Sequence, residues 1–427
     1  MESYKLEEFS VALDKRGARE FSKLSFPIRY GRFSEIQTKD YLFQFNLKGE
    51  IKYIQGRGPR WPHPGEWLKR TAGNDWIYYS SGDYSGVYDL FGEYYIPCLS
   101  YPSNSVMGGH PFQDDAVRSA IESWQRLLDE IGGMISGSIP QGLRDFLVLV
   151  TQNDAETLRR KADRLHRLLG GRVTVLPPDT RHVDYDVIPL IVADGCLHNC
   201  GFCRVKTGRD FSLRTEQNIL EQIEGLKAFY GPDLSNYNSL FLGQHDALHA
   251  GREILEFAAL KAYEVFEFTR SDLRGPRLFL FGSVESLMSS PEELFESLNG
   301  LPFSTYINIG LESADPATLA ILKKPVAPAR VAGAFGRMVE INRRYEKLEI
   351  TANFILGGDL PESHLSSLLV LARDGLDRFY DKGAIYLSPL MDGKPITAGA
   401  RRRMLKSFHA VKISSRLPVF IYLIQRL

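Results

Sequence analysis

The stretch VIPLIVADGCLHNCGFC, residues 187–203, decides the fold. Its first six residues form an apolar run of the length and β-branched composition typical of a buried strand. Three cysteines follow at the spacing C-x3-C-x2-C, at Cys196, Cys200 and Cys203. Because the cysteines come directly after the strand, we expect them on a loop at its carboxyl end.

Strands and helices alternate regularly downstream of this loop. The pattern predicts helices over 215–230, from about 251 and from about 291, and Asp315-Pro316 supplies a further helix start. Six strand-helix alternations predict a parallel α/β fold, a partial TIM-like (β/α)6 barrel over about 181–400. Its chemistry is expected at the carboxyl ends of the strands. The predicted strands are 187–192, 239–243, 277–282, 305–310, 349–358 and 384–390.

The first 180 residues have a different pattern and predict an aromatic-rich α+β accessory domain. Residues 41–55 favour two strands joined by a turn at 47–49, and helices are expected over 112–132 and 154–169. The runs FLVLV (146–150) and RVTVL (172–176) are interpreted as strands, and 177–186 as a linker. A helix and a strand over 401–427 extend the chain beyond the barrel.

Composition narrows the class of protein. The 427 residues contain 52 Lys and Arg and 52 Asp and Glu, so no net field favours nucleic-acid binding. No stretch approaches the ~20 apolar residues of a membrane helix, and the charged start is unlike a signal peptide, which indicates a cytoplasmic protein. Only four cysteines occur, and the clustering of three of them does not suit a disulfide framework.

The cysteine motif favours an iron–sulfur cluster over a zinc site. Three thiolates bind three irons of a cluster and leave the fourth iron open to a ligand. Structural zinc wants four ligands, usually in two separated pairs; His198 would be a strained fourth ligand, and no second C-x2-C pair exists. A simple electron carrier is a further alternative, but it leaves the open iron unexplained.

This motif after the first strand of an α/β barrel resembles the radical S-adenosylmethionine (SAM) superfamily. Phe202 fits, because members usually carry an aromatic residue before the third cysteine. The resemblance covers about residues 186–390. It implies a [4Fe-4S] cluster, SAM bound to the open iron, reductive cleavage to a 5′-deoxyadenosyl radical, and a low-potential electron donor such as flavodoxin or ferredoxin.

The resemblance also implies SAM contacts at later strand ends. In FLGQHDAL (241–248), Gly243, Gln244 and Asp246 stand where members hold the SAM amino group, although the common Gly-Gly-Glu is altered; Asp246 as a mere helix cap is the alternative. In GLES (310–313), Glu312 or Ser313 would reach the ribose or the methionyl end, and an ion pair at the rim is the alternative.

The two last predicted strands carry weaker signals. In ANFILGG (352–358), Ile355 and Gly357 match the segment that supports adenine in the family, with Asn353 where a glycine is common. In the last strand, Ser388 is expected near the rim, whereas Tyr386 is better interpreted as core packing.

The substrate class stays open between a small molecule, which we favour, and a tRNA or peptide, which usually brings a basic face or a recognition domain. Cleavage of another SAM bond would transfer a 3-amino-3-carboxypropyl group, for example to arsenic as in arsinothricin-type biosynthesis. Cys98 alone cannot hold a second cluster, and no Asp-x-His-x-x-Gly cobalamin motif occurs. Five aromatic side chains near the N-terminus suit a substrate pocket or, more simply, a packed core: Trp61, His63, Trp67, Trp76 and Tyr79.

Anaerobically reconstituted protein should carry about four irons and four sulfides per chain. Cys200→Ala should abolish the cluster, because only two protein ligands remain. Iron and sulfide analysis measures this, with Cys98→Ala as the control that keeps the cluster. A Cys200→Ala variant with a full cluster that still turns over SAM would contradict the ligand assignment.

Overall fold

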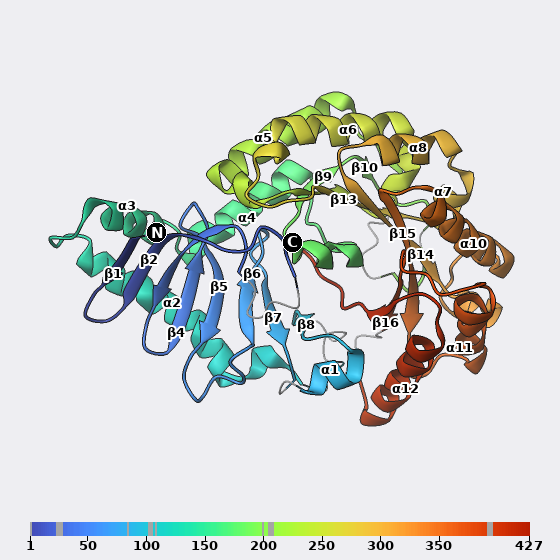
Figure 1. Ribbon diagram of the computed structural model, residues 1–427, viewed down its shortest axis with the longest axis horizontal. Coiled ribbons are helices and arrows are strands. Elements are labelled where there is room, and N and C mark those ends of the chain that lie inside the picture. The colour runs from blue at the N-terminus through green and yellow to red at the C-terminus, as the bar shows by residue number, and fades with distance from the viewer. Residues whose placement is uncertain are drawn as a thin grey trace.

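Two large sheets organise the described residues, an antiparallel sheet in the N-terminal part and a parallel sheet in the rest (Figure 1). The computed structural model describes residues 2–22, 29–82, 85–100, 106, 109–198, 200–203, 209–390 and 396–427. Within these ranges, no helix is long and apolar enough to cross a membrane.

The N-terminal sheet has eight strands that pair antiparallel in chain order. The predicted hairpin over 41–55 is confirmed, since β4 and β5 flank the expected turn. The strands are β1 Glu2–Lys5, β2 Ser10–Arg16, β3 Arg32–Gln37, β4 Tyr41–Phe45, β5 Ile51–Gly56, β6 Trp67–Arg70, β7 Trp76–Ser80 and β8 Ile96–Cys98.

Helices α2 (Asp115–Met134) and α3 (Gln141–Thr151) pack on one face of this sheet, and α4 (Ala155–Leu169) follows. The predicted strand over 146–150 is wrong, because this run belongs to α3. Leu143, Phe146, Leu147 and Val150 recur at helical spacing and are all buried. The short helix α1 (Ser85–Phe91) lies between β7 and β8 in the chain.

The predicted strand over 172–176 is also absent. Its backbone bonds to the C-terminal residues instead, with Leu176 N donating to Gln425 O at 2.8 Å and Leu427 N donating to Val173 O at 3.1 Å. A local sequence pattern cannot reveal a backbone partner about 250 residues away in the chain, so the strand predicted over 172–176 is wrong.

The parallel sheet has seven strands in the order β17-β16-β15-β14-β13-β12-β9, and all six strands predicted here are present. The described strands do not close into a barrel, since β9 and β17 are two free edges of the order. C-terminal β17 is the seventh strand and pairs parallel with β16. The strands are β9 Ile188–Ile191, β12 Ser239–Gly243, β13 Arg277–Gly282, β14 Ser304–Glu312, β15 Leu348–Leu356, β16 Ile385–Pro389 and β17 Val419–Ile421.

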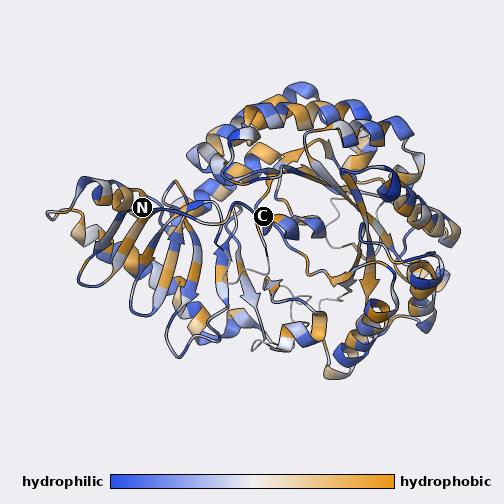
Figure 2. Ribbon diagram, in the orientation of Figure 1, coloured by the Kyte–Doolittle hydropathy of each residue, from blue (hydrophilic) through white to orange (hydrophobic). Residues whose placement is uncertain are grey.

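Helices connect these strands and cover one face of the sheet, where the apolar side chains of the strands and helices form the largest core (Figures 1 and 2). Two short helices, α7 and α9, were not distinguished by the sequence pattern, although the Asp315 cap of α9 was. The helices are α5 Glu216–Tyr230, α6 Gly251–Val265, α7 Val284–Ser289, α8 Glu292–Gly300, α9 Pro316–Ile321, α10 Pro328–Arg344, α11 Glu362–Leu369 and α12 Ala398–Ser414.

Residues 177–186 are not the exposed linker that their prolines suggest. They contain the 3-10 helix η3 (Pro178–Val183), which packs against the sheet face opposite the helices. Asp179 is fully buried and accepts hydrogen bonds from Thr351 and Tyr386, both at 2.8 Å. His182 stacks on Tyr306 with ring centroids 5.0 Å apart. This segment therefore fills the face of the parallel sheet near the strand starts.

A buried ionic cluster joins the two sheets. The Lys69 ammonium of β6 lies 3.0 Å from Asp184 and 2.9 Å from Asp186, which immediately precede β9, and all three side chains are less than one-tenth exposed. Tyr30 and Tyr53 also donate to Asp184. Because a buried charge without its partner is costly, this cluster holds the N-terminal sheet against the start of the parallel sheet.

Asp179 predicts a pH-dependent stability. Burial raises the pKa of Asp179 to about 7, against hydrogen bonds from Tyr386 and Thr351 that lower it. The folded state therefore holds a proton that the unfolded chain releases above about pH 4, and stability falls as pH rises from about 4 to about 7, by about 4 kcal/mol at most.

Asp179→Asn should remove this decline, so that the variant is more stable than the parent at pH 8 and similar at pH 4. Urea unfolding across this range measures it, with exposed Asp89→Asn as the control. An Asp179→Asn variant with the parent's pH profile would contradict a titration at this residue.

Candidate active site

A small strand pair clamps the base of the cysteine loop. β10 (Ala193–Asp194) pairs antiparallel with β11 (Ser212–Leu213) on either side of it. Gly195 has φ +77°, and a Cβ there would lie 2.0 Å from the backbone oxygen of Asp210, so only glycine fits. Cys196 N then donates to Arg209 O at 3.3 Å. The chain thus leaves β9 and returns within one closed loop that carries all three cysteines.

The three cysteines of this loop form no disulfide among the described residues; Cys200 is buried, and Cys196 and Cys203 are half-buried. Burial raises the pKa of Cys200, and the Lys324 ammonium lowers it. Among the described residues, no group of three His, Cys, Asp or Glu side chains is placed to hold a single metal ion. A four-iron cluster needs a wider arrangement, because its thiolates bind three different irons.

Two later elements support the loop. Gly201 N donates to Leu322 O at 3.1 Å, just after α9, and a Cβ on Gly201 would touch the Lys323 side chain. His198 Nε2 lies 2.8 Å from Glu285 Oε2 in the first turn of α7. The imidazole that a zinc site would require is thus engaged by a carboxylate. Phe202, the residue after Gly201, is half-buried.

The turn after β12 carries a carboxylate, Asp246, with one oxygen that accepts no hydrogen bond from the described residues. Asp246 is 2% exposed; Oδ1 accepts from Ser283 N at 3.0 Å, whereas Oδ2 has no partner among the described residues. Burial raises the pKa of Asp246, and hydrogen bonds from Ser286 and Ser283 lower it. The Asp246 charge also acts on the Cys196 thiol, so this orphaned oxygen is suited to a cation beside the cysteine loop.

The other predicted residues of this turn are placed differently. Gln244 Nε2 donates to Arg172 O at 3.1 Å, which directs its side chain to the N-terminal part of the chain. Gly243 is buried, and a Cβ there would come within 3.1 Å of Phe241 and Ile191. Of the predicted set, Asp246 is thus the residue with an unused polar atom.

At the end of β14, Glu312 and Ser313 have separate surroundings. Glu312 has φ +64°, and its Oε1 lies 3.5 Å from Lys324 Nζ while Oε2 accepts from Asn353 at 3.2 Å. Ser313 is fully buried, and its hydroxyl lies 2.8 Å from His364 Nδ1. Glu312 therefore joins the polar groups near the cysteines, whereas Ser313 is engaged inside the fold.

A row of polar contacts crosses three neighbouring strand ends. Ser388 of β16 donates to Asn353 Oδ1 at 2.7 Å, and Asn353 of β15 donates to Glu312 of β14. Nearby, Ile355 is 2% exposed, and a Cβ on Gly357 would lie 2.9 Å from Leu360. The departure from glycine at Asn353 thus supplies the link between Glu312 and Ser388.

Sequence reasoning missed Glu285 and Lys324. Glu285 follows the third predicted strand after the capping Ser283, a signal that a search for strand-end carboxylates would have found. Lys324 lies beyond the GLES segment (310–313), and its pairing with Glu312 depends on how the chain returns after α9.

The aromatic residues near the N-terminus mostly form core. Trp61 and Trp67 are less than one-tenth exposed, and Tyr79 is fully buried with its hydroxyl 2.5 Å from Asp184 Oδ1. His63 and Trp76 are half-buried. For Trp61, Trp67 and Tyr79 the interpretation as packed core is confirmed.

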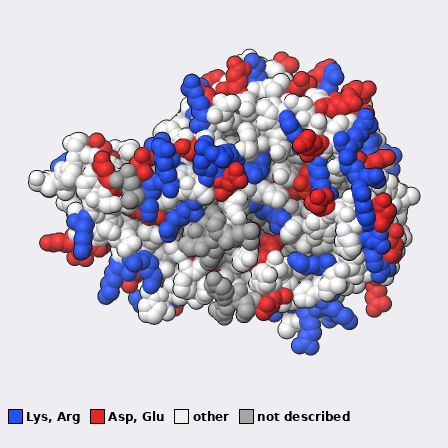
Figure 3. Space-filling view, viewed as in Figure 1, with Lys and Arg blue, Asp and Glu red and all other residues white. Residues whose placement is uncertain are grey.

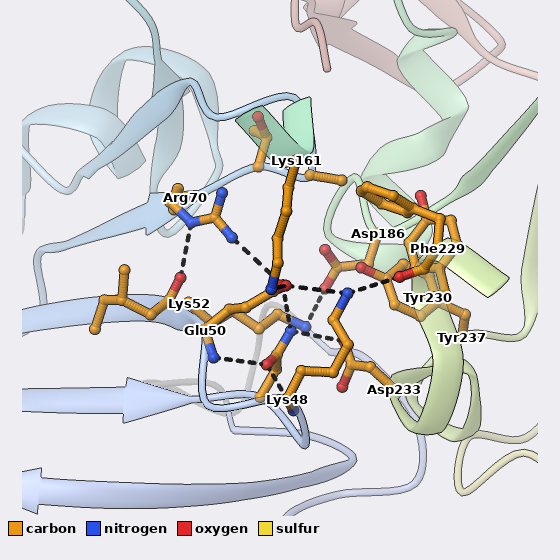
Figure 4. Close-up of a pocket in the computed structure, with 14 residues that line it drawn as sticks. Lys48, Glu50, Lys52, Arg70, Lys161, Asp186, Phe229, Tyr230, Asp233 and Tyr237 are labelled. Carbon is orange, nitrogen blue, oxygen red and sulfur yellow. Dashed lines mark hydrogen bonds and ion pairs between the residues drawn. The ribbon is translucent and has the colours of Figure 1, made fainter. Parts of the chain in front are cut away.

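A cavity of about 30 Å³ lies on the seam between the sheets, away from the cysteine loop. Figure 4 shows Lys48, Arg70 and Lys161 converging on Glu50, at 3.0, 3.6 and 2.6 Å. These three cations hold the pKa of Glu50 at about 2, against the effect of burial. The cavity has room for about two water molecules. Asp186 of the buried ionic cluster that joins the two sheets also lines it.

Residues 190–370 match the model of the radical SAM superfamily. This match covers the cysteine loop and the ends of β12, β14 and β15, where the carboxylates lie. The chain therefore contains a radical SAM domain and is an enzyme whose domain implies a [4Fe-4S] cluster and SAM. The three cysteine thiols fit the cluster, and the Asp246 oxygen that has no partner among the described residues fits the ammonium of SAM.

The solved structures that this chain matches include three radical SAM enzymes. A radical SAM methyltransferase from Sphaerobacter thermophilus is 15% identical, with a TM-score of 0.34 over 56% of this chain and 66% of its own. SuiB from Streptococcus suis is 10% identical, with a TM-score of 0.37 over 90% and 72%. The cobalamin-dependent enzyme OxsB is 18% identical, with a TM-score of 0.32 over 56% and 32%. No curated protein matches the chain.

Asp246→Asn and Glu312→Gln should each weaken SAM binding roughly ten- to hundredfold, the loss expected of one charge-assisted contact. Cluster content should stay unchanged, because neither residue is a cluster ligand. Equilibrium binding of SAM to reconstituted protein, with iron analysis alongside, measures both. Binding equal to the parent in both variants would show that these carboxylates are structural.

Proposed function

We propose that this enzyme cleaves SAM reductively at a [4Fe-4S] cluster held by Cys196, Cys200 and Cys203 and starts radical chemistry on a small-molecule substrate. The observation that carries the proposal is the orphaned Asp246 oxygen beside the cysteine loop. A buried carboxylate oxygen that accepts no hydrogen bond destabilises the fold, and a hydrogen bond from an ammonium group such as that of SAM would offset this free-energy cost.

Each residue near the loop has a distinct part in this proposal. The cysteines bind three irons and leave the fourth to SAM, Asp246 accepts from the SAM ammonium, and Glu312 accepts from the ribose hydroxyls. Ile355 and the close backbone at Gly357 give adenine an apolar support. When bound, the cluster supplies the electron that breaks a carbon–sulfur bond of SAM.

The wider organisation follows from the same proposal. Residues 181–400 would act as a partial barrel around SAM, with 1–180 as an accessory domain and 401–427 as an extension. The enzyme would work in the cytoplasm with a low-potential donor such as flavodoxin or ferredoxin. Acidic and basic side chains are interspersed over much of the face in Figure 3, which favours a small substrate over a nucleic acid.

The products released from SAM identify which of its carbon–sulfur bonds breaks. Reduced protein given SAM should release 5′-deoxyadenosine, and Cys200→Ala should release none. Chromatography with mass spectrometry identifies the fragment. Methylthioadenosine would contradict this choice of bond and favour 3-amino-3-carboxypropyl transfer, and no fragment from cluster-loaded protein would contradict the proposal altogether.

A further inference from the structure

The cavity on the seam between the two sheets is lined by charged side chains from both parts of the chain (Figure 4). Its cations belong to the N-terminal part, whereas Asp186 and Asp233 belong to the part that carries the parallel sheet. Among the described lining residues, four cations exceed three carboxylates by one charge. Burial also raises the pKa of Asp233, which disfavours its negative charge. The charged lining consists of Lys48, Lys52, Arg70 and Lys161 and of Glu50, Asp186 and Asp233.

Lys52 of β5 has hydrogen-bonding capacity that the protein does not use. Its side chain is 14% exposed, and within the described part of the chain its one ion pair is with Asp186 Oδ2, at 2.8 Å. The ammonium otherwise lies over the rings of Tyr30, Tyr53 and Tyr237, at 5.1, 5.7 and 5.9 Å from their centroids. Because an ammonium has three N–H donors, two of them have no oxygen acceptor among these contacts.

Tyr230 adds a second unused donor to the same cavity. The residue is 2% exposed, lines the cavity from α5, and its hydroxyl has no partner among the residues that the structure describes. Burial raises the pKa of Tyr230, and so do the charges of Asp186 and Asp233, so the hydroxyl keeps its proton. A buried donor without an acceptor costs free energy. The cavity therefore brings together unsatisfied donors from β5 and from α5, one on each side of the seam.

The size and charge of the cavity define its ligand. The space of about 30 Å³ holds about two water molecules, which is too little for sulfate or phosphate with their four oxygens. A metal cation would add to the net positive charge, and water would leave that charge without a counterion. A chloride ion is only slightly larger than a water molecule, carries one negative charge and accepts hydrogen bonds from several directions. A halide therefore matches the space, the net charge and the unused donors.

We propose that the cavity is a binding site for one chloride-sized anion, held by the Lys52 ammonium and the Tyr230 hydroxyl. The ion accepts from β5 of the N-terminal sheet and from α5 of the part that carries the parallel sheet, so it joins the two parts next to the cluster of Lys69, Asp184 and Asp186. The site is separate from the cysteine loop and requires neither the iron–sulfur cluster nor SAM. Its occupancy stabilises the folded state, because only the folded chain assembles these donors.

The test compares sodium chloride with sodium gluconate at equal ionic strength, because gluconate is too large for the cavity. The thermal unfolding midpoint of the full chain, loaded with its cluster, is measured over a range of each salt. Chloride should raise the midpoint along a saturating curve, and gluconate should not. Bromide should act like chloride, and crystals grown with bromide should show an anomalous-scattering peak between Lys52 and Tyr230.

Tyr230→Phe removes the hydroxyl donor and keeps the ring, so it should fold and weaken the apparent chloride affinity roughly two- to tenfold, the loss expected of one neutral hydrogen bond. The matched control is Tyr88→Phe, since Tyr88 is 52% exposed and does not line the cavity; it should respond to chloride like the parent. Equal midpoint shifts in chloride and gluconate would overturn the inference, because they would show general salt screening. Parent-like chloride affinity in Tyr230→Phe, or crystals without a bromide peak in the cavity, would overturn it as well and leave a cavity that holds water only.

Discussion

The candidate active site depends on one constraint: the strands of the parallel sheet have their carboxyl ends on the same side of the sheet. In the parallel sheet, the strands β9, β12, β13, β14, β15 and β16 run in the same direction and pair in chain order. Each strand therefore delivers its following loop to the same side of the sheet. Cys196 and Glu312 are more than 100 residues apart in the chain, yet the charge of Asp246 acts on the Cys196 thiol and the charge of Glu312 acts on the Cys200 thiol. The shared direction of the strands, more than any local motif, brings these side chains together.

The loop itself is held at three points of different character. Backbone pairing between β10 and β11 closes its base, Gly195 permits the close approach to Asp210, and His198 is tied to Glu285 on α7. Asp246 accepts from Ser283 at the start of the same helix. The cysteine loop, through His198, and Asp246 are thus both held by the start of α7, which favours a preorganised site.

The sequence predicts what local periodicity and strand ends can reveal. Six of the seven strands of the parallel sheet and the Asp315 helix cap were predicted, because each pairs a clear apolar run or cap with turn residues. The strand predicted over 146–150 was wrong, because a run of five apolar residues does not show the helical period that begins at Leu143. Residues 177–186 were interpreted as a linker because Asp179 finds its partners, Thr351 and Tyr386, only in tertiary structure. Lys324 and its pairing with Glu312 lay beyond sequence reasoning for the same reason.

The central claim is that this loop carries a cluster with one iron open to SAM. The most direct measurement is the electron paramagnetic resonance spectrum of the reduced, reconstituted protein before and after addition of SAM labelled with ¹⁵N at its amino group. The account predicts a SAM-dependent change in the spectrum and a hyperfine coupling to the labelled nitrogen, since that nitrogen would lie on the open iron. A cluster spectrum that SAM leaves unchanged, with no coupling to the label, would contradict it.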